Sequence, residues 1–600
     1  MASTAPPPTE TWQLGDIFES EDALLESKRN LEAEIPTLDQ WQGRLTESPA
    51  VLAEALDRIT DAYRRFAALR CHASLRSDED TRVARHQAVR QEIDLLATQL
   101  SSQVSYLRPE ILRLEPERLE EFLATEPRLE DHAFFLRDLI RQRAHVLQPG
   151  EERILSYSGL LTGSAGSLYN VLHNAEMPRP SVTLESGESV RLTPVNFRMH
   201  RSSPNRDDRK KVFVANYEGY AALGNTLGQN LFNGTKGHLF RARSRGYSSC
   251  LAAALDGSNI PTDVYRNLIN QTRRRLPVLH RYFRIRARAL GLERLEYHDL
   301  YCSIGQSEPP RFTPDEARRT VCESLEPLGR RYLDSLHTAF DRRWIDWHPA
   351  PGKRSGAYAT GWAYDAHPFV LLNFTGDFES VSTLTHEMGH AMHSHFSNST
   401  LPFATADYPV FVAEVASTLN EALLSRRMLE ISPEADQQIF LLGSYLDTLR
   451  GTLFRQAMFA EFELEIHERV ERGEVLTGES LGEIYLGLLR DYHGHDEGVM
   501  TIDDRYAVEW AAVPHFYYDF YVYQYATGIV AANALAEAVT CGPPTAVERY
   551  LTFLASGGSD YALNLLRKAG VDLETSEPYD ATFDAAERRL DQLEDLIRSR

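Results

Sequence analysis

Long apolar runs are missing from this sequence of 600 residues. No stretch of about 18 uninterrupted apolar residues occurs, so we predict no membrane-spanning helix and no membrane partner. The N-terminal segment also lacks the basic region and apolar core that are typical of a secretory signal peptide. We therefore expect a cytoplasmic protein.

Cysteine is scarce, and positively charged residues are outnumbered. The five cysteines are scattered, odd in number and form no Cys-x-x-Cys pair, which argues against a disulfide framework and fits a reducing compartment. Lysine and arginine number 64 against 86 aspartates and glutamates, and the formal net charge is −22. An acidic surface repels phosphate groups, so we predict no nucleic-acid partner.

Helical periodicity, by contrast, is abundant. Between residues 22 and 123 apolar side chains recur at spacings of three and four, as in Leu52, Leu56, Ile59, Ala62 and Phe66. Residues 181–192 alternate apolar and polar side chains about a glycine turn, which predicts a small β-hairpin among the helices. We predict a mostly α fold, with an N-terminal helical region over 1–200 and a second helical domain over 201–600.

One motif organises the second region, namely His386-Glu387-Met388-Gly389-His390. On a helix, residues four apart lie about 6 Å apart along the axis and on nearly the same face, so two imidazoles can converge on one ion. Glu387 falls on the flank of that face, close to the ion without being aimed at it. This pattern is typical of a zinc site with a carboxylate base beside it.

The residues around the motif favour a helix with one buried side. Val381, Leu384, Met388, Ala391 and Met392 recur at spacings of three, four and seven, in a stripe roughly opposite the histidines. Motifs of five residues also arise by chance, and most single histidines are only packed or solvated. The metal hypothesis therefore needs further ligands elsewhere in the chain.

A catalytic zinc usually has three protein ligands and one open position. We predict Glu414 as the third ligand, because a carboxylate on an otherwise apolar helix is costly to bury unpaired. Glu421 lies seven residues further along, on the same face. Three roles stay open for it, namely an alternative ligand, a partner that orients a histidine, and a solvated side chain. His393 returns to the histidine face, but it lies about 10 Å from His386 along the axis, too far to share the ion easily.

A short apolar run, Phe369-Val-Leu-Leu-Asn-Phe374, precedes the motif helix and predicts a strand. Two interpretations stay open. As an edge strand beside the metal, it would hold an extended peptide through backbone hydrogen bonds. Alternatively, it is an ordinary buried strand.

An aromatic block lies between Trp510 and Gly528. It holds nine aromatic side chains, counting His515. Several hydroxyl groups and an imidazole cannot all be buried without hydrogen-bond partners. Donors of this kind near a zinc site can stabilise the oxyanion of a tetrahedral intermediate.

Together, the motif helix, the segment Ala413-Glu414-Val-Ala-Ser-Thr-Leu-Asn-Glu421 and the aromatic block resemble oligoendopeptidase F, of the thimet-oligopeptidase-like zinc metallopeptidases. Arg354-Ser-Gly-Ala-Tyr358 and Arg243-Ser-Arg-Gly-Tyr247 agree with the resemblance, which covers residues from about 180 to about 590. It implies an elongated, two-lobed helical shell around a deep substrate channel, with a small β element beside the zinc-site helix.

The resemblance also implies a role for each matching residue at the metal. His386, His390 and Glu414 correspond to the ligands of one zinc ion, and Glu387 corresponds to the base. His515 corresponds to a catalytic histidine that contacts the substrate.

Further residues match the family outside the metal site. The segment Tyr521-Val-Tyr-Gln524-Tyr525 fits the family's Tyr-x-x-Gln-Tyr pattern. Tyr525 is therefore expected to donate to the oxyanion, while Tyr521, Tyr358 and Gly356 are expected to contact the substrate. Residues 493–500 depart from the family's pattern, and no role is transferred to the loop over 493–505.

The implied activity is zinc-dependent cleavage of internal bonds in short, unstructured peptides. One alternative is a metallocarboxypeptidase, since related clans also carry His-Glu-x-Gly-His. Another is a non-catalytic protein that only binds peptides. A structural zinc would require four protein ligands, often including cysteine, and no cysteine neighbours the motif.

Overall fold

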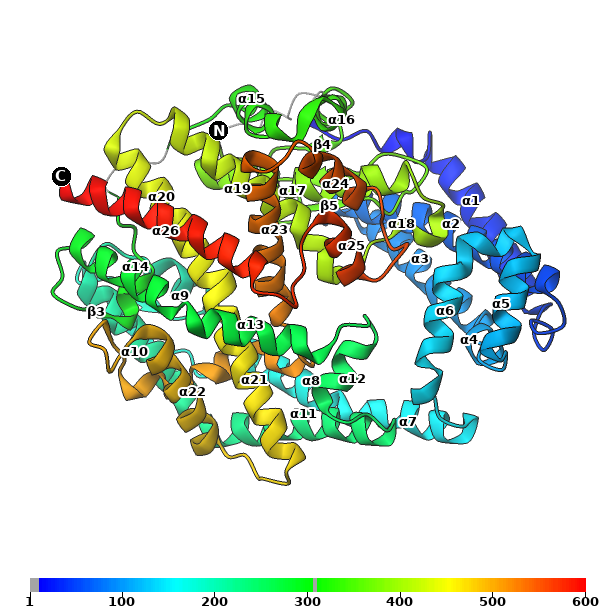
Figure 1. Ribbon diagram of the computed structural model, residues 1–600, viewed down its shortest axis with the longest axis horizontal. Coiled ribbons are helices and arrows are strands. Elements are labelled where there is room, and N and C mark those ends of the chain that lie inside the picture. The colour runs from blue at the N-terminus through cyan, green and yellow to red at the C-terminus, as the bar shows by residue number, and fades with distance from the viewer. Residues whose placement is uncertain (1–9, 306–309) are drawn as a thin grey trace. The chain divides into compact units, whose positions relative to one another are not determined.

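The structure is a computed structural model that describes residues 10–305 and 310–600. Within these residues the fold is mostly helical, as predicted, with three small sheets (Figure 1). The helices form two compact units. Unit 1 takes the described parts of Met1–Ala144, Pro309–Arg427 and Leu535–Val571, and unit 2 those of His145–Glu308, Met428–Ala534 and Asp572–Arg600. A division near residue 200 stays a prediction.

Unit 1 is built mainly from helices near the N-terminus and around the motif. Its helices are α1 (Glu21–Glu34), α2 (Pro49–Glu79), α3 (Ala84–Gln103), α4 (Leu107–Ile111), α5 (Pro116–Thr125), α6 (Ala133–Arg141), α15 (Pro314–Ser324), α16 (Gly329–Asp341), α17 (Phe378–Asn398), α18 (Phe403–Ala406), α24 (Thr545–Leu554) and α25 (Ala562–Ala569). Two further helices, α19 (Val410–Ile431) and α23 (Tyr523–Cys541), contain a boundary between the units.

Unit 2 takes most of the remaining helices. They are α7 (Pro149–Thr162), α8 (Ser164–Val171), α9 (Pro194–His200), α10 (Arg206–Ala221), α11 (Gly224–Ser244), α12 (Cys250–Asp256), α13 (Thr262–Arg274), α14 (Leu276–Ala289), α20 (Ala435–Leu449), α21 (Arg455–Glu471), α22 (Gly478–His493) and α26 (Glu577–Arg598). Strands β1 (Ser181–Thr183) and β2 (Ser189–Arg191) pair antiparallel where the sequence predicts a hairpin, and β3 (Leu295–Glu296) pairs with β7 (Met500–Thr501). Across residues 10–305 and 310–600, no helix combines the length and apolar character needed to cross a bilayer.

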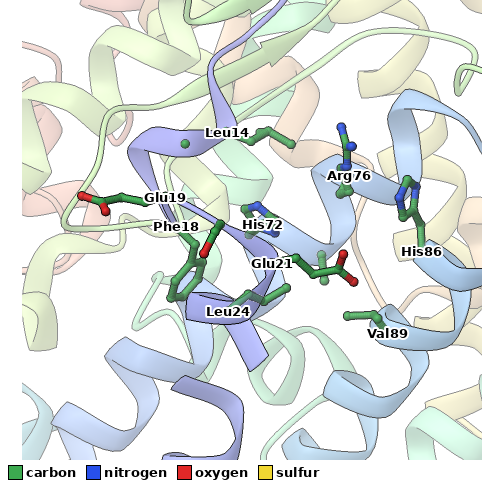
Figure 2. Close-up of a pocket in the computed structure, with 12 residues that line it drawn as sticks. Leu14, Phe18, Glu19, Glu21, Leu24, His72, Arg76, His86 and Val89 are labelled. Carbon is green, nitrogen blue, oxygen red and sulfur yellow. The ribbon is translucent and has the colours of Figure 1, made fainter. Parts of the chain in front are cut away.

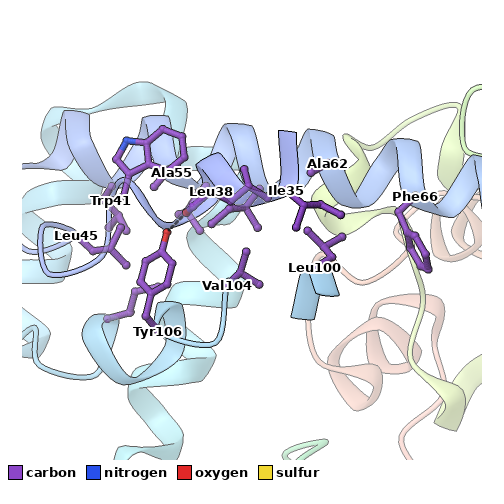
Figure 3. Packing of buried hydrophobic residues seen from close by; sticks show 14 of the residues in the cluster. Ile35, Leu38, Trp41, Leu45, Ala55, Ala62, Phe66, Leu100, Val104 and Tyr106 are labelled. Carbon is purple, nitrogen blue, oxygen red and sulfur yellow. Dashed lines mark hydrogen bonds between the residues drawn. The ribbon is translucent and has the colours of Figure 1, made fainter. Parts of the chain in front are cut away.

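The N-terminal part of unit 1 has its own apolar core. The predicted stripe of α2 is buried, with Leu52 fully inaccessible and Ile59 at 3% exposure. Figure 3 shows side chains from α2, from residues 35–45 and from residues 100–106 gathered in this core. The Tyr106 hydroxyl donates to the Leu38 carbonyl at 2.6 Å, so its polar end is satisfied inside the core. This core fixes α2, which also lines a pocket described below.

A three-stranded sheet lies beside the motif helix in unit 1. Its order is β4 (Ile345–Asp346), β6 (Phe369–Leu371), β5 (Tyr358–Thr360), with β6 parallel to β4 and antiparallel to β5. All three residues of β6 are buried, and the strand is paired on both edges. The edge-strand interpretation of 369–374 is therefore wrong, because β6 has no free edge left for a peptide. The edge strands of this sheet are β4 and β5.

The motif helix α17 begins where its sequence provides a cap. The Asp377 side chain accepts from the Ser380 backbone, which satisfies one of the first free amides of the helix. The predicted apolar stripe of α17 is completely buried, as Leu384 and Met388 illustrate. On the adjoining face, Gly389 lies against α19 so closely that a Cβ atom would come within 2.5 Å of the Ser417 Cα. The glycine of the motif thus lets α17 and α19 approach one another.

Candidate active site

The structure brings the three predicted metal ligands together in unit 1. His386 and His390 on α17 have their Nε2 atoms 3.2 Å apart. The Glu414 Oε2 atom on α19 lies 3.3 Å from His386 Nε2 and 3.5 Å from His390 Nε2. Ligands bound to one zinc ion at about 2.0–2.1 Å in tetrahedral geometry are separated by roughly these distances. The three atoms therefore have the spacing and the chemistry of a divalent cation site.

The orientation of the rings also fits a shared ion. The imidazoles of His386 and His390 are inclined at 78°, with ring centroids 4.9 Å apart. In a linear hydrogen bond between the two nitrogens, the centroids would be further apart. The two Nε2 atoms instead face each other at an angle, which is the arrangement that a shared cation requires.

Two carboxylates flank the ring of His386. Glu414 faces its Nε2 atom, and the Glu421 Oε1 atom lies 3.3 Å from its Nδ1 atom. Although burial lowers the pKa of His386, the two carboxylates together raise it to about 10. Burial raises the pKa of Glu414, but the two imidazoles outweigh it and hold that pKa well below its ordinary value. Of the roles considered for Glu421, the geometry matches a partner that orients a ligand.

Ser417 is a contact of the site that the sequence reasoning did not assign. Its hydroxyl lies 3.1 Å from Glu414 Oε2 and donates to it, while the residue itself is fully buried. Ser417 follows Glu414 by three residues on the same face of the helix, and this spacing could have indicated the contact. Ser417 restricts the rotation of the Glu414 carboxylate.

Glu387 lies on α17 between the two histidines and is 7% exposed. Burial raises its pKa, which the neighbouring imidazoles of His386 and His390 partly oppose. The backbone of Ala359, in β5, hydrogen-bonds its carboxyl group. A buried carboxyl group with a raised pKa beside a metal site suits a general base.

Of the predicted substrate contacts, Tyr358 is the first residue of β5 and Gly356 lies two residues before it. Gly356 has φ +85°, and a Cβ atom there would meet nothing within 4 Å. The Asn373 amide donates to the Gly356 carbonyl at 2.7 Å and fixes this turn. The Tyr358 hydroxyl donates to Asp78 at 2.9 Å, so its side chain is anchored within unit 1.

His393 takes no part in the ligand group. It is 1% exposed and stacks on Tyr408, with ring centroids 3.7 Å apart. Burial lowers the pKa of His393 to about 3, so its ring stays neutral. The structure therefore agrees with leaving this residue out of the ligands.

A pocket of about 880 Å³ in unit 1 adjoins the ligand group. Its wall includes Ala359 of β5, Ser394 of α17 and Ala413 of α19. Ser394 lies four residues beyond His390, and Ala413 lies directly before Glu414. The aromatic side chains of Tyr63 and Phe66 on α2 and of Trp362 also line it, and the Arg70 guanidinium lies 4.9 Å from the Trp362 ring centroid. The pocket is thus mainly apolar and aromatic.

A second hollow, of about 230 Å³, lies between α1, α2 and α3. Figure 2 shows His72, Arg76 and Glu21 around it. None of the predicted site residues lines it.

The aromatic residues predicted to act in catalysis form a cluster in unit 2. His515 belongs to the short helix η11 (Pro514–Tyr517), and α23 begins at Tyr523. The His515 ring centroid is 6.2 Å from that of Tyr521 and 6.0 Å from that of Tyr525, and the two tyrosine rings are 5.5 Å apart. Burial lowers the pKa of His515, which favours its neutral form.

Two histidines and a glutamate on one helix, with a glutamate of a second helix facing the histidines, are an arrangement typical of metal-dependent hydrolases. The profile described as "Peptidase family M3" matches residues 199–585, and the profile described as "Oligopeptidase F" matches residues 110–178. The chain belongs to peptidase family M3 and is a peptidase of the oligoendopeptidase F type.

Two curated relatives and two solved structures resemble the chain along nearly its whole length. Oligopeptidase PepF of Bacillus subtilis is 37% identical over 98% of this chain and 87% of its own, and group B oligopeptidase PepB of Streptococcus agalactiae is 37% identical over 98% and 97%. A crystal structure from Chlamydophila abortus superposes with a TM-score of 0.93 at 35% identity, covering 98% of both chains. Oligoendopeptidase-F from Enterococcus faecium has a TM-score of 0.74 at 31% identity, covering 98% of this chain and 100% of its own.

Proposed function

We propose that this protein is a zinc-dependent endopeptidase that hydrolyses internal bonds of short, unstructured peptides. The observation that carries the proposal is the convergence of His386, His390 and Glu414, whose ligand atoms lie 3.2–3.5 Å apart beside Glu387. Membership of peptidase family M3 supports peptide hydrolysis. The relatives' names, oligopeptidase and oligoendopeptidase, support short substrates and internal cleavage.

One zinc ion per chain would be held by His386, His390 and Glu414. Two imidazole nitrogens and one carboxylate oxygen are donors that zinc prefers, and they leave a fourth position open. When bound, zinc supplies a Lewis acid that polarises the scissile carbonyl and lowers the pKa of a water molecule. Glu421 keeps the proton of His386 on Nδ1, so that the Nε2 lone pair stays available.

Glu387 acts as the base in this mechanism. Its carboxylate accepts the proton of the attacking water and passes it to the leaving amine. Burial raises its pKa, which brings the carboxyl group closer to the range in which it can both accept and return a proton. The hydrogen bond with the Ala359 backbone limits its rotation.

His515 and Tyr525 are proposed as donors to the oxyanion, with Tyr521 as a substrate contact. Support comes from the family pattern of their segment and from the common cluster of the three rings. A hydroxyl and an imidazole N–H are neutral donors that stabilise charge developing on a carbonyl oxygen.

The substrate is proposed to lie along β5, with Gly356 and Tyr358 at the start of its path. Because β5 is an edge strand of its sheet, an extended peptide can add to it as a further strand. The open space above Gly356 allows a close approach of the peptide backbone. The adjoining 880 Å³ pocket would then accept large apolar or aromatic side chains.

A reducing compartment suits the protein, which supports a cytoplasmic location. All five cysteines are free thiols, and Cys541 is exposed. Exposed free thiols are rarely retained in oxidising compartments.

The proposal is tested with a length-graded set of unstructured peptides that are blocked at both termini. Each is incubated with the zinc-loaded wild type, with Glu387→Gln and with Glu379→Gln, an exposed glutamate on the same helix. We expect internal cleavage of short peptides by the wild type and by Glu379→Gln, and loss of turnover on the order of 100-fold or more in Glu387→Gln. Mass spectrometry of the products locates each cut.

Three outcomes would contradict the proposal in different ways. Cleavage that requires a free C-terminus would indicate a metallocarboxypeptidase. Retention of intact peptides by zinc-loaded protein that cleaves none of them would indicate a binding protein. Full turnover in Glu387→Gln would remove that residue from the mechanism.

A further inference from the structure

Two consecutive residues in unit 2 have left-handed backbone conformations although neither is glycine. Asp519 has φ +56° and Phe520 has φ +61°. Such conformations are unfavourable for residues with a Cβ atom, and they persist where the surroundings hold them. The two residues form a strained turn between Tyr518 and Tyr521.

Glu463 of α21 holds one half of this turn. Its Oε1 atom accepts the backbone N–H of Phe520 at 2.7 Å, and the residue is fully buried. The ring of Phe520 is enclosed by Tyr265 and His467, at centroid distances of 5.5 Å and 4.4 Å. Phe520 is thereby fixed through both its backbone and its side chain.

Asp519 is held from a different helix, α11. Its carboxylate accepts from Arg241 at 2.9 Å and lies 3.4 Å from His238 Nδ1. The partly buried carboxylate is thus held to α11 by its hydrogen bond from Arg241. Together with Glu463 on α21, these contacts determine the turn from two sides.

His238, His467 and Asp519 contain the ligand types of a metal site, but their geometry is that of a hydrogen-bonded chain. His238 Nδ1 and His467 Nε2 are 3.0 Å apart, the rings are parallel within 3°, and their centroids are 5.3 Å apart. The centroids are about as far apart as a nitrogen–nitrogen distance of 3.0 Å allows, so the two nitrogens point directly at each other. In His386 and His390, by contrast, the rings are inclined at 78°.

The tautomers of this chain follow from its ends. His467 Nδ1 lies 2.7 Å from the Glu463 carbonyl oxygen, so this nitrogen carries the proton that is donated. Its Nε2 atom is then the acceptor, and His238 donates to it from Nδ1. Burial lowers the pKa of His238 to about 4 and that of His467 to about 3, so both rings are neutral.

The turn reverses the chain between the elements that carry the proposed oxyanion donors. His515 precedes it in η11, and Tyr521 and Tyr525 follow it. The rings of Tyr521 and Tyr525 are neighbours of the His515 ring only because the chain folds back here, with centroids 6.2 Å and 6.0 Å from that of His515. A different backbone path at 519–520 would separate His515 from the tyrosines.

We propose that Glu463 and Asp519 are positioning residues for the reaction, which hold the strained turn at 519–520 and thereby orient His515, Tyr521 and Tyr525. The expected effect on kinetics rests on the proposed function. The structural role of the two residues in holding the turn does not depend on it. Neither residue contacts the substrate in this scheme. Their effect is on the geometry of the donors, and therefore on turnover more than on substrate binding.

The test compares two replacements of Glu463. Glu463→Gln keeps an oxygen that can accept the Phe520 N–H, whereas Glu463→Met has a similar length and no such acceptor. We expect Glu463→Gln to retain kcat close to that of the wild type. Glu463→Met should lower kcat on the order of 10- to 100-fold, as for a misplaced catalytic group, with little change in KM or zinc content.

A second pair tests the other half of the turn. Asp519→Asn keeps an acceptor for Arg241 and should lower kcat less than Asp519→Ala does. The proposal is overturned if folded, zinc-loaded Glu463→Met has the kcat of the wild type, or if the Gln and Met variants lose activity equally.

A readout without catalysis separates this proposal from the proposed function. The imidazole resonances of His515 are assigned by their loss in His515→Gln. They should move in Glu463→Met and stay in place in Glu463→Gln, because the ring faces Tyr521 and Tyr525. If the wild type cleaves no peptide but these shifts occur, the proposed function fails while the positioning role stands. Unchanged resonances in Glu463→Met would overturn the positioning role whatever the activity.

Discussion

Glu421 lies 3.3 Å from the Nδ1 atom of His386, on the opposite side of the ring from Glu414. This contact fixes both the tautomer and the tilt of a proposed metal ligand. Replacing Glu421 with Gln should weaken zinc binding about 10- to 100-fold, as is typical for the loss of a partner that orients a ligand. Competition with a chromogenic chelator measures the affinity.

The control for Glu421 is another glutamate of α19. Glu430 is exposed, so Glu430→Gln should bind zinc like the wild type. Equal zinc affinity in Glu421→Gln and the wild type would show that the contact does not orient His386.

Gly389, inside the histidine motif, is required by the distance between α17 and α19. A Cβ atom there would lie 2.5 Å from Ser417 Cα and 2.7 Å from the Ala416 carbonyl oxygen, and both are backbone atoms that cannot rotate away. Gly389→Ala should therefore lower the free energy of unfolding by about 1–3 kcal/mol or more. It should also weaken zinc binding, since it moves Glu414 away from the histidines. Thermal unfolding and zinc content are the measurements.

Gly487 in α22 provides the matched control, because a Cβ atom there meets nothing within 4 Å. Alanine is favoured over glycine inside a helix by roughly 0.5–1 kcal/mol, so Gly487→Ala should be neutral or slightly stabilising. If Gly389→Ala unfolds and binds zinc like the wild type, the close approach of the helices does not require glycine.

The local part of this site could be predicted from the sequence. Two histidines four residues apart and an apolar stripe fix one helix and the direction of both rings, whatever the rest of the chain does. Glu414 could be predicted because a lone carboxylate on an apolar helix needs a partner. Each of these predictions depends only on the periodicity within one helix, α17 for the histidines and α19 for Glu414.

Other features depend on neighbours that are distant in sequence. The apolar run at 369–374 indicates a strand, but only its pairing with β4 and β5 shows that β6 is central rather than an edge. The left-handed turn at Asp519 has no glycine to mark it, and it is held by residues of α11 and α21. Segments far apart in sequence form each compact unit, which no local pattern of residues indicates.

Tyr525 is proposed to donate to the oxyanion, and its removal should affect mainly turnover. Tyr525→Phe should lower kcat on the order of 100- to 1000-fold with a small change in KM, since the hydrogen bond forms in the transition state. Tyr521→Phe should raise KM more than it lowers kcat, if Tyr521 contacts the substrate. Steady-state kinetics with one blocked peptide separates the two effects.

Tyr518 is the control for the tyrosine variants. It belongs to the same aromatic cluster, but its side chain is 50% exposed. Tyr518→Phe should leave both kinetic parameters near those of the wild type. Turnover of Tyr525→Phe equal to that of the wild type would remove Tyr525 from the donor role.

Glu463 gives the stability of the protein a defined pH dependence. Burial raises its pKa from the ordinary 4.5 to about 8, and its Oε2 atom has no hydrogen-bond partner among the described residues. Between these two values the folded protein holds a proton that the unfolded chain releases, so this group destabilises the fold increasingly as the pH rises through that window. Its stabilising contribution is complete below pH 4.5 and is lost by about pH 8.

Glu463→Gln cannot ionise, so its stability does not fall in this way as the pH rises. The difference in Tm between Glu463→Gln and the wild type should therefore shift in favour of Glu463→Gln from about pH 5 to about pH 8, by on the order of a few degrees. Glu463→Met should show the same slope with pH at a lower Tm throughout, because it also cannot ionise but leaves the Phe520 N–H unpaired. A difference between Glu463→Gln and the wild type that stays constant over this range would show that Glu463 is ionised in the folded protein.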